Sequence, residues 1–570
     1  MARTINIGGQ GFEDIRSSGD FYVDKTGFVR DWWLARDQVT LICRPRRFGK
    51  TLNLDMCRCF LSRDFANRGD ELFGGLDVWE GGTVEERAAM RALQGTVPVV
   101  FLSFARCKGA TLEESLGSMR QVIRVAVRSH DYLFESEHLN EDDRTFLRRV
   151  SDDMDTVTAT TCLGQLCSML HRHHDVKPVI LLDEYDTPMQ EAWLSGYWDG
   201  MSSFVRQLFN ATFKTNPDLG RALVTGITRV ASESIFSDMN NPRVVSTTTS
   251  AYETAFGFTE EEVARSLDEF GMEERLPAVR TWFDGFTFGD VPGIYNPWSI
   301  THFLVEGRLD TYWANSSSNA LVSDLVRQGD EDLKTDFEDL LDGRTLVKQV
   351  DERVHFRRLR TDSDALWALL LATGYLRVER RLSEAAPWQL ELALTNREVA
   401  SAFDGMVHDW FAEDRRSYNG FVRALLACDL RSMNGYLASI ALTCMSSFDS
   451  GTRPSEATQP ERFWHGLVLG LLVDLRGRYE VRSQPESGFG RCDVLLTPLD
   501  GPDGTDPAYV LEFKVVDTWN DEYSLADAVA SAHAQIEERA YVSALVERGI
   551  APARIHAYGI AFQGKQVLVG

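Results

Sequence analysis

The stretch Val39–Thr51, with the sequence VTLICRPRRFGKT, decides the fold of the first half of the chain. A short apolar run, Val39–Cys43, is followed at once by turn residues, a pattern that predicts a buried strand. Gly-Lys-Thr after such a strand, at the start of a helix, is typical of a nucleotide phosphate site, because loop and helix N–H groups face the anion. Lys50 is expected to reach the outer phosphates and the Thr51 hydroxyl to ligate Mg²⁺. The expected nucleotide-binding residues of this stretch are Arg46, Arg47, Phe48, Gly49, Lys50 and Thr51.

The match to the usual G-x-x-x-x-G-K-[ST] pattern is incomplete, since Arg44 stands where the first glycine belongs. Gly-Lys-Thr alone is common by chance. On that tripeptide alone, a helix start with a surface lysine is the better interpretation, so the rest of the chain must decide.

The composition predicts a multidomain globular protein. The chain has 570 residues, 44% of them hydrophobic and 25% charged, which is enough for about three to four domains. The formal net charge of −25 argues against a generally basic nucleic-acid-binding surface but leaves a local basic groove open. Nine cysteines without a C-x-x-C pair favour reduced thiols. No signal peptide is visible, and the longest apolar run (467–473) is too short to span a bilayer, so we expect a cytoplasmic protein without a membrane partner.

A second apolar run, Val179–Leu182, ends in Asp183 and Glu184. Ligands of parallel sheets gather at the carboxyl ends of the strands, so Asp183 is expected beside the phosphate loop, where it can hold Mg²⁺. Glu184 can orient or deprotonate the attacking water. The alternative is a strand followed by an acidic turn, which the upstream Gly-Lys-Thr makes less attractive.

A further strand, Ala222–Gly226, contains Thr225 and leads to Thr228 and Arg229. These three residues are expected to sense the γ-phosphate. The order of strand, loop, helix, strand, helices, acidic strand and Thr/Arg strand predicts a doubly wound α/β sheet of the P-loop NTPase type. The extra strand and the Glu after the Asp favour a hydrolase over a nucleotide kinase.

Several other features have two interpretations. Asp24 and Lys25 are either functional or part of a helix-capping turn, and His171, His173 and His174 form either a metal site or a solvated helix end, which we favour. The segment 295–299 (YNPWS) predicts a turn that enters a helix. The predicted organisation is an α/β nucleotide-binding domain over 1–300, a mainly helical connecting region over 301–455 with linker composition at 451–460, and an α/β domain over 456–570.

The last domain carries a second set of polar residues. Asp493 is expected to begin one apolar strand, and Glu512 and Lys514 lie two residues apart on the next, so they share a face. Two carboxylates and a lysine on adjacent strands are typical of a Mg²⁺-dependent phosphodiesterase, in which the carboxylates hold the cation and the lysine acts on the nucleophile or the phosphate. A strand with an exposed ion pair is the alternative. The pairs Glu461/His465 and Gln535/Tyr541 are each expected on a helix, and Glu461 is a candidate metal ligand.

With these residues in view, the chain resembles bacterial proteins that join an AAA-like ATPase domain to a C-terminal PD-(D/E)XK nuclease-superfamily domain, whose fold is restriction-endonuclease-like. The motifs that carry the resemblance occur in the family's order: FYVDKT (21–26), RPRRFGKT (44–51), LLDEYDTP (181–188), TGITR (225–229), SIFS (234–237), YNPWS (295–299), HG (465–466), GRCD (490–493), EFK (512–514) and QI-x4-Y (535–541). The resemblance implies ATP binding by Lys50 and Thr51, metal binding by Asp493 and Glu512, and a catalytic Lys514.

Three functions follow as hypotheses. The first is an ATP-regulated nuclease, with DNA as the expected substrate and defence or mobile-element biology as the expected context. The second is an ATP-dependent switch whose nuclease-like domain binds without cutting. The third is a nuclease whose nucleotide is structural. A homo-oligomer is compatible with all three, and Arg229 is a candidate arginine finger.

Overall fold

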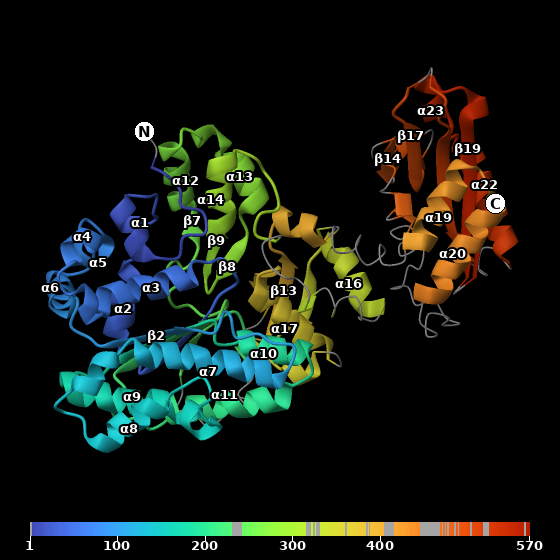
Figure 1. The fold of residues 1–570 in the computed structure, drawn as a ribbon. Coiled ribbons are helices and arrows are strands. Elements are labelled where there is room, and N and C mark those ends of the chain that lie inside the picture. The colour runs from blue at the N-terminus through green and yellow to red at the C-terminus, as the bar shows by residue number, and fades with distance from the viewer. Residues whose placement is uncertain are drawn as a thin grey trace. The chain divides into compact units, whose positions relative to one another are not determined.

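The structure, a computed structural model, forms two compact units, Met1–Ala402 and Phe403–Gly570 (Figure 1). The predicted linker at 451–460 lies outside the described residues, so the three-part division stays a prediction. The structure describes residues 3–230, 242–314, 321–322, 325, 331–341, 343–359, 362–382, 386, 388–403, 415–444, 468–469, 471–472, 475, 478–483, 486–487, 490–501, 504–516, 524–563 and 566–570.

A five-stranded parallel sheet forms the centre of the first unit. Its order is β2-β3-β4-β1-β6, so β4 lies between the phosphate-loop strand β1 and the acidic strand β3. Strands β1 and β3 are buried along their whole length, as expected for continuous apolar runs covered on both faces. The strands are β1 (Val39–Cys43), β2 (Val99–Ser103), β3 (Val179–Asp183), β4 (Arg221–Gly226) and β6 (Arg243–Val245).

Helices cover both faces of this sheet, with α7, α9 and α11 on one side and α2 and α3 on the other (Figure 1). Side-chain caps begin many of them. Thr111, for example, forms a capping box with Glu114 at the start of α7. The helices are α1 (Phe12–Ser18), α2 (Gly27–Ala35), α3 (Lys50–Leu61), α4 (Gly69–Phe73), α5 (Asp77–Glu80), α6 (Val84–Leu93), α7 (Leu112–Arg128), α8 (Glu141–Arg149), α9 (Thr156–His174), α10 (Thr187–Leu194) and α11 (Trp198–Phe213).

The rest of the first unit adds smaller sheets and helices. A β7-β9-β8 sheet packs with α12, α13 and α14, and the middle region contains a three-stranded antiparallel sheet, β10-β13-β12, that the helical pattern did not predict. The elements are β5 (Arg229–Val230), β7 (Phe258–Thr259), α12 (Glu260–Glu269), α13 (Leu276–Phe283), β8 (Phe286–Phe288), β9 (Val291–Tyr295), α14 (Pro297–Glu306), α16 (Glu331–Leu341), β10 (Leu346–Gln349), β11 (Arg353–Val354), α17 (Ser363–Thr373), β12 (Leu376–Arg381) and β13 (Gln389–Leu394).

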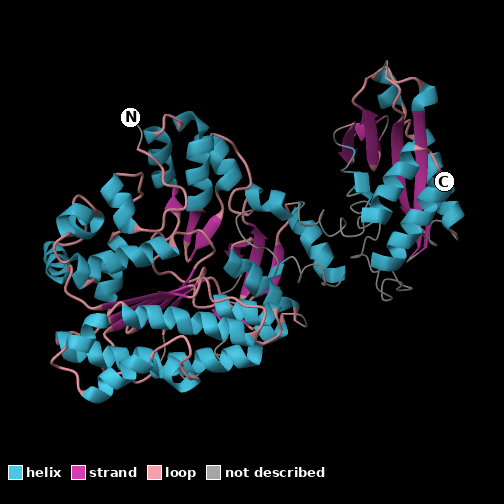
Figure 2. Cartoon of the chain, viewed as in Figure 1, coloured by secondary structure: helices cyan, strands magenta, loops and turns pink. Residues whose placement is uncertain are grey.

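The second unit is built on a mixed sheet, drawn as magenta strands in Figure 2. Its strand order is β14-β17-β18-β19-β20. Strands β17 and β18 are antiparallel, as the predicted hairpin requires. Strand β19 runs parallel to β18, and α22 packs on β18 and β19. The elements are α19 (Arg415–Leu426), α20 (Leu430–Cys444), β14 (Tyr479–Ser483), β15 (Glu486–Ser487), β16 (Gly490–Arg491), β17 (Val494–Pro498), β18 (Ala508–Val515), α22 (Leu525–Glu538), α23 (Ser543–Glu547), β19 (Ile555–Gln563) and β20 (Gln566–Val569).

The predicted fold class is confirmed: a parallel α/β sheet, a largely helical middle and a C-terminal α/β sheet domain. In the described part of the chain, every helix is too short or too polar to cross a membrane.

Candidate functional sites

The phosphate loop leaves β1 at Arg44 and enters α3 at Lys50. Gly49 is the N-cap of α3 at φ +76° and has no side chain that could cap the helix. Uncapped N–H groups at a helix start are the arrangement that binds a phosphate. Arg47 is also in the left-handed region, at φ +66°, where a side chain is strained and needs support from its surroundings.

Arg44, in the place of the missing glycine, is fully buried and ties the loop to the rest of the unit. Its guanidinium donates to the carbonyl oxygens of Ser246 and, at 3.3 Å, Ala251, and lies 4.4 Å from the centre of the Phe288 ring. Burial lowers its pKa to about 10, so it stays charged near neutrality. Arg44 thus anchors the base of the loop.

Lys50 is only 4% exposed, and its ammonium remains within the loop. Nζ donates to the carbonyl oxygens of Arg44 at 3.1 Å and Pro45 at 2.9 Å, and lies 4.0 Å from Glu184 Oε1. These carbonyls hold the buried charge where a phosphate would be bound. The alternative of a surface lysine at a helix start is wrong.

Asp183, at the carboxyl end of β3, is bonded to the first turn of α3 and to β4. It is 1% exposed and accepts hydrogen bonds from Thr51 Oγ1 at 2.7 Å and Thr225 Oγ1 at 2.6 Å. Burial and the neighbouring Glu184 raise the pKa of Asp183, against the opposing effect of the two hydroxyls and Lys50. A carboxylate and a hydroxyl oxygen in contact are a suitable donor set for Mg²⁺, which takes few protein ligands and keeps several waters.

Glu184 follows directly, with a backbone φ of +53°. The next acid, Asp186, is fully buried and accepts from Thr228 N at 2.8 Å and Thr228 Oγ1 at 2.7 Å. The Tyr185 hydroxyl donates to the carbonyl of Thr228 at 2.7 Å. These bonds fix the end of β3 against the end of β4, and so fix the unusual backbone at Glu184.

A cavity of about 430 Å³ lies over the loop, a size that suits a cofactor. Its lining includes Lys50, Thr51, Glu184, Arg46 and Arg47. From the N-terminal segment it includes Ile5, Asn6, Gly8, Gly9, Gln10, Phe21, Tyr22, Val23 and Lys25. Within the FYVDKT motif, Lys25 donates to Glu262 at 2.6 Å and to the carbonyl of Thr254 at 2.7 Å, so it fixes this wall. Asp24 accepts from Thr26 and from Asp77 N, which matches the predicted turn.

Three residues that contact the phosphate loop could not be identified as site residues from the sequence pattern. Asn296 Nδ2 and Trp313 Nε1 donate to the carbonyl of Arg46, at 3.3 and 2.9 Å. The Trp298 ring lies 4.0 Å from the Arg47 guanidinium carbon. The YNPWS motif signalled the helix start, which is confirmed, but its contact with the loop depends on the tertiary fold.

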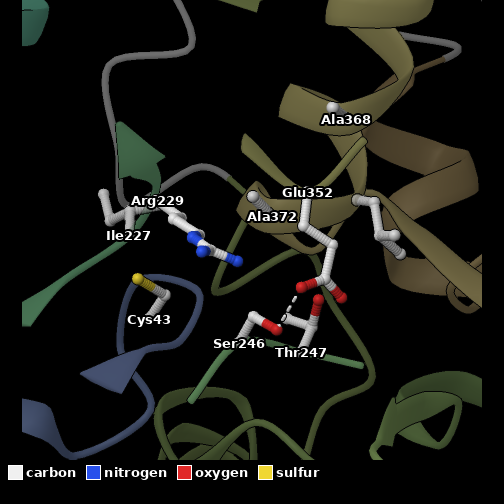
Figure 3. Close-up of a pocket in the computed structure, with 9 residues that line it drawn as sticks. Cys43, Ile227, Arg229, Ser246, Thr247, Glu352, Ala368 and Ala372 are labelled. Atoms are coloured by element: carbon white, nitrogen blue, oxygen red, sulfur yellow. Dashed lines mark hydrogen bonds between the residues drawn. The ribbon is translucent and has the colours of Figure 1, made fainter. Parts of the chain in front are cut away.

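Arg229 does not line the cavity over the loop. It lies in β5, which pairs with β11, and its guanidinium points into a small hollow of about 10 Å³ that also contacts Cys43 and Glu352 (Figure 3). In that hollow, Glu352 accepts from Ser246 Oγ at 2.5 Å. A contact of Arg229 with nucleotide therefore stays a prediction that the geometry of a single chain does not support.

The predicted catalytic residues of the second unit meet at one place. Asp493 Oδ2 accepts from Phe513 N at 2.8 Å, and Asp493 N donates to Glu512 Oε2 at 3.4 Å. Glu512 is 2% exposed, and Lys514 Nζ lies 3.9 Å from Glu512 Oε1. A buried glutamate is costly without partners, so the strand is not one with an exposed ion pair.

Gln535, on α22, joins these groups. Its Oε1 accepts from Lys514 Nζ at 2.7 Å, and its Nε2 donates to Glu512 Oε1 and, at 3.1 Å, to the Tyr541 hydroxyl. The predicted pair Gln535 and Tyr541 therefore does frame the site, although Tyr541 lies just past the end of α22 rather than on it. Glu461 and His465 lie outside the described residues.

Asp493 and Glu512 provide oxygen donors that suit a hard cation. Among the residues that the structure describes, no three His, Cys, Asp or Glu side chains group as a metal site. Mg²⁺ accepts such a sparse set, because it is usually held by one or two carboxylates together with water and substrate phosphate.

The histidines at the end of α9 are hydrogen-bonded rather than clustered for metal binding. His171 Nδ1 lies 2.7 Å from Asp218, His173 Nδ1 lies 2.7 Å from Ser136 Oγ, and His174 Nε2 lies 2.9 Å from the Tyr132 hydroxyl. Burial lowers the pKa of His174 to about 4, which keeps it neutral. This helix end has a structural role.

Comparison with known proteins gives two family matches. Residues 6–236 match a predicted AAA-ATPase family, and residues 459–570 match the PD-(D/E)XK nuclease superfamily. A curated protein of Azotobacter chroococcum mcd 1, described as an uncharacterized protein in the vnfD 5′ region, is 24% identical over 336 residues. The match covers 57% of this chain and 56% of that protein, so the chain spans little more than half of its relative. No solved structure gives a significant match.

The two family matches occur in the order that the motifs predict, and they point to an enzyme. The chain therefore joins a predicted AAA-ATPase domain to a C-terminal PD-(D/E)XK nuclease-superfamily domain.

Proposed function

We propose that the protein binds and hydrolyses ATP in its first unit and cleaves phosphodiester bonds of nucleic acid, with DNA as the expected substrate, in its second. The observation that carries the cleavage half is the joined set Asp493, Glu512 and Lys514, held together through Gln535. The observation that supports the nucleotide half is the bond from Thr51 to Asp183 above a buried Lys50. A cytoplasmic location, self-association and a role in defence or mobile-element biology belong to the same proposal.

In the nucleotide site, Lys50, Arg46, Arg47 and the N-terminus of α3 would bind the phosphates. Thr51 and Asp183 would hold Mg²⁺, which neutralises phosphate charge when bound. Glu184 would orient the attacking water and accept its proton. Thr225 would keep Asp183 in place through their 2.6 Å bond.

In the nuclease site, Asp493 and Glu512 would hold a divalent cation, which activates water and offsets charge on the scissile phosphate. Lys514 would stabilise the extra negative charge of the transition state. Gln535 would orient both Lys514 and Glu512, since it bonds to each.

The second candidate is an ATP-dependent switch that binds nucleic acid or protein without cutting. It is favoured by the net charge of −25 and by a carboxylate set that, among the described residues, contains only two members. Cleavage itself separates the two functions.

The test incubates the purified protein with linear and circular DNA, with and without Mg²⁺ and ATP. Wild type is compared with Glu184→Gln, which should lose ATP turnover, and Asp493→Ala, which should lose cleavage but keep turnover. Cleavage that persists in Asp493→Ala would contradict the proposed nuclease site. Turnover that persists in Lys50→Ala would contradict the nucleotide site. Intact turnover without cleavage in wild type would favour the switch.

A further inference from the structure

The loop that follows β2 carries a lysine into the nucleotide cavity. Lys108 lines this cavity together with Lys50, Thr51 and Glu184, although it lies 57 residues beyond Thr51 in the chain. Neither the phosphate-loop pattern nor the acidic strand pointed to it.

The loop that carries Lys108 is fixed on both sides. Phe104 N donates to the carbonyl of Asp183 at 2.9 Å, which ties the loop to the end of the acidic strand. Cys107 is fully buried, and the Tyr197 hydroxyl donates to the carbonyl of Gly109 at 2.7 Å. The backbone at Lys108 is therefore held in place while its side chain is exposed.

The ammonium of Lys108 differs from those of the other lysines of the cavity. Lys25 is bonded to Glu262 and Lys50 to two loop carbonyls. For Lys108 Nζ, no hydrogen bond or ion pair is found within the described part of the chain. Glu184 is the one carboxylate that lines this cavity among the described residues, so an anionic ligand would meet an excess of positive charge.

The sheet register indicates which part of the ligand Lys108 would meet. Strand β2 lies beside β3, and Ser103 pairs with Asp183, so the ends of these two strands adjoin. Lys108 follows the first of these ends and Glu184 the second. Both residues line the same cavity. If Glu184 orients the attacking water as proposed, Lys108 would approach the terminal phosphate from the neighbouring strand end.

We propose that Lys108 binds the terminal phosphate of ATP and lets the site distinguish a nucleoside triphosphate from a diphosphate. The inference rests on the proposed nucleotide site and adds a contact that ADP cannot make.

The test measures binding of Mg²⁺ with a non-hydrolysable ATP analogue, and with ADP, to the full-length protein by calorimetry. Lys108→Ala should weaken triphosphate binding about tenfold, because one charge-assisted contact in a partly solvated site is lost, and should leave ADP binding within about twofold of wild type. Lys108→Arg should retain most of the triphosphate affinity. Arg106→Ala is the matched control, since Arg106 is exposed on the same loop and does not line the cavity.

Equal affinities of wild type and Lys108→Ala for the triphosphate, or equal losses for both nucleotides, would overturn the inference. If wild type binds both nucleotides and Lys50→Ala loses both, the nucleotide site stands whatever Lys108→Ala does. If wild type binds neither nucleotide, the nucleotide site and this inference both fall.

Discussion

The two sites differ in how far apart in the sequence their parts lie. The nuclease-like site is assembled from five residues between Asp493 and Tyr541, which lie at the start of β17, on β18, and on or just after α22, the helix that packs on β18. The phosphate loop depends on Asp183, Asn296, Trp298 and Trp313, which lie more than 130 residues away. The first kind of site is sensitive mainly to its own residues, whereas the second depends on the folding of the whole unit around it.

The largest expected effect tests the local character of the nuclease-like site. Lys514→Ala should lower DNA cleavage by about a hundredfold or more, because in the proposed mechanism it removes the cation that stabilises the developing phosphate charge. ATP turnover should stay within about twofold of wild type. Arg482→Ala is the control, as this residue forms an exposed ion pair with Glu480 on β14. Parallel loss of turnover would show that the two sites are not independent.

An effect of comparable size tests the long-range support of the phosphate loop. Glu398 is 1% exposed and accepts from Ser299 Oγ and Trp313 N, so it holds the segment that bonds Arg46. Burial raises its pKa to about 7 from 4.5, so the folded protein binds its proton more tightly than the unfolded chain does. This contribution to stability is complete below the unfolded pKa and is lost as pH rises through about 7, a loss of about 3 kcal/mol.

Glu398→Gln cannot titrate, so its stability should vary less between pH 5 and 8 than that of wild type. Calorimetric unfolding of the full chain, following the transition that nucleotide shifts, measures the difference. Equal pH slopes would mean that Glu398 is not the group responsible.

The smallest effect concerns a single ring. Trp298→Ala should weaken ATP binding roughly fivefold, because the Arg47 guanidinium loses a cation–π contact worth about 1 kcal/mol. Trp298→Phe should lose less. Trp388→Ala serves as the control, since this tryptophan is 51% exposed and does not line the nucleotide cavity. A loss as large in Trp388→Ala would indicate a general change of the unit.

Much of the fold follows from local pattern. The apolar runs predicted at 39–43, 179–182 and 222–226 are buried strands, and Pro297 begins α14 as its position predicts. The antiparallel sheet of β10, β12 and β13 was missed. Strand β13 (QLELAL) alternates polar and apolar residues, which is a strand pattern, but β10 (LVKQ) and the end of β12 (LRVERR) do not alternate, and all three strands are short.

Positions of site residues could be predicted where they follow directly from a strand. The position of Asp183 follows from the direction of its strand, and the shared face of Glu512 and Lys514 follows from the two-residue period of theirs. Arg229 is different: Thr225 in β4 points to Asp183, but four residues later the chain has turned to pair with β11. Lys108 could not be found, because its cavity exists only once β2 lies beside β3.

Arg44 also has a consequence for protein engineering. Arg44→Gly would restore the consensus glycine of the phosphate loop. It would instead leave the carbonyls of Ser246 and Ala251 without their donor and open a void beside Phe288. In this protein the consensus residue is expected to be the damaging one.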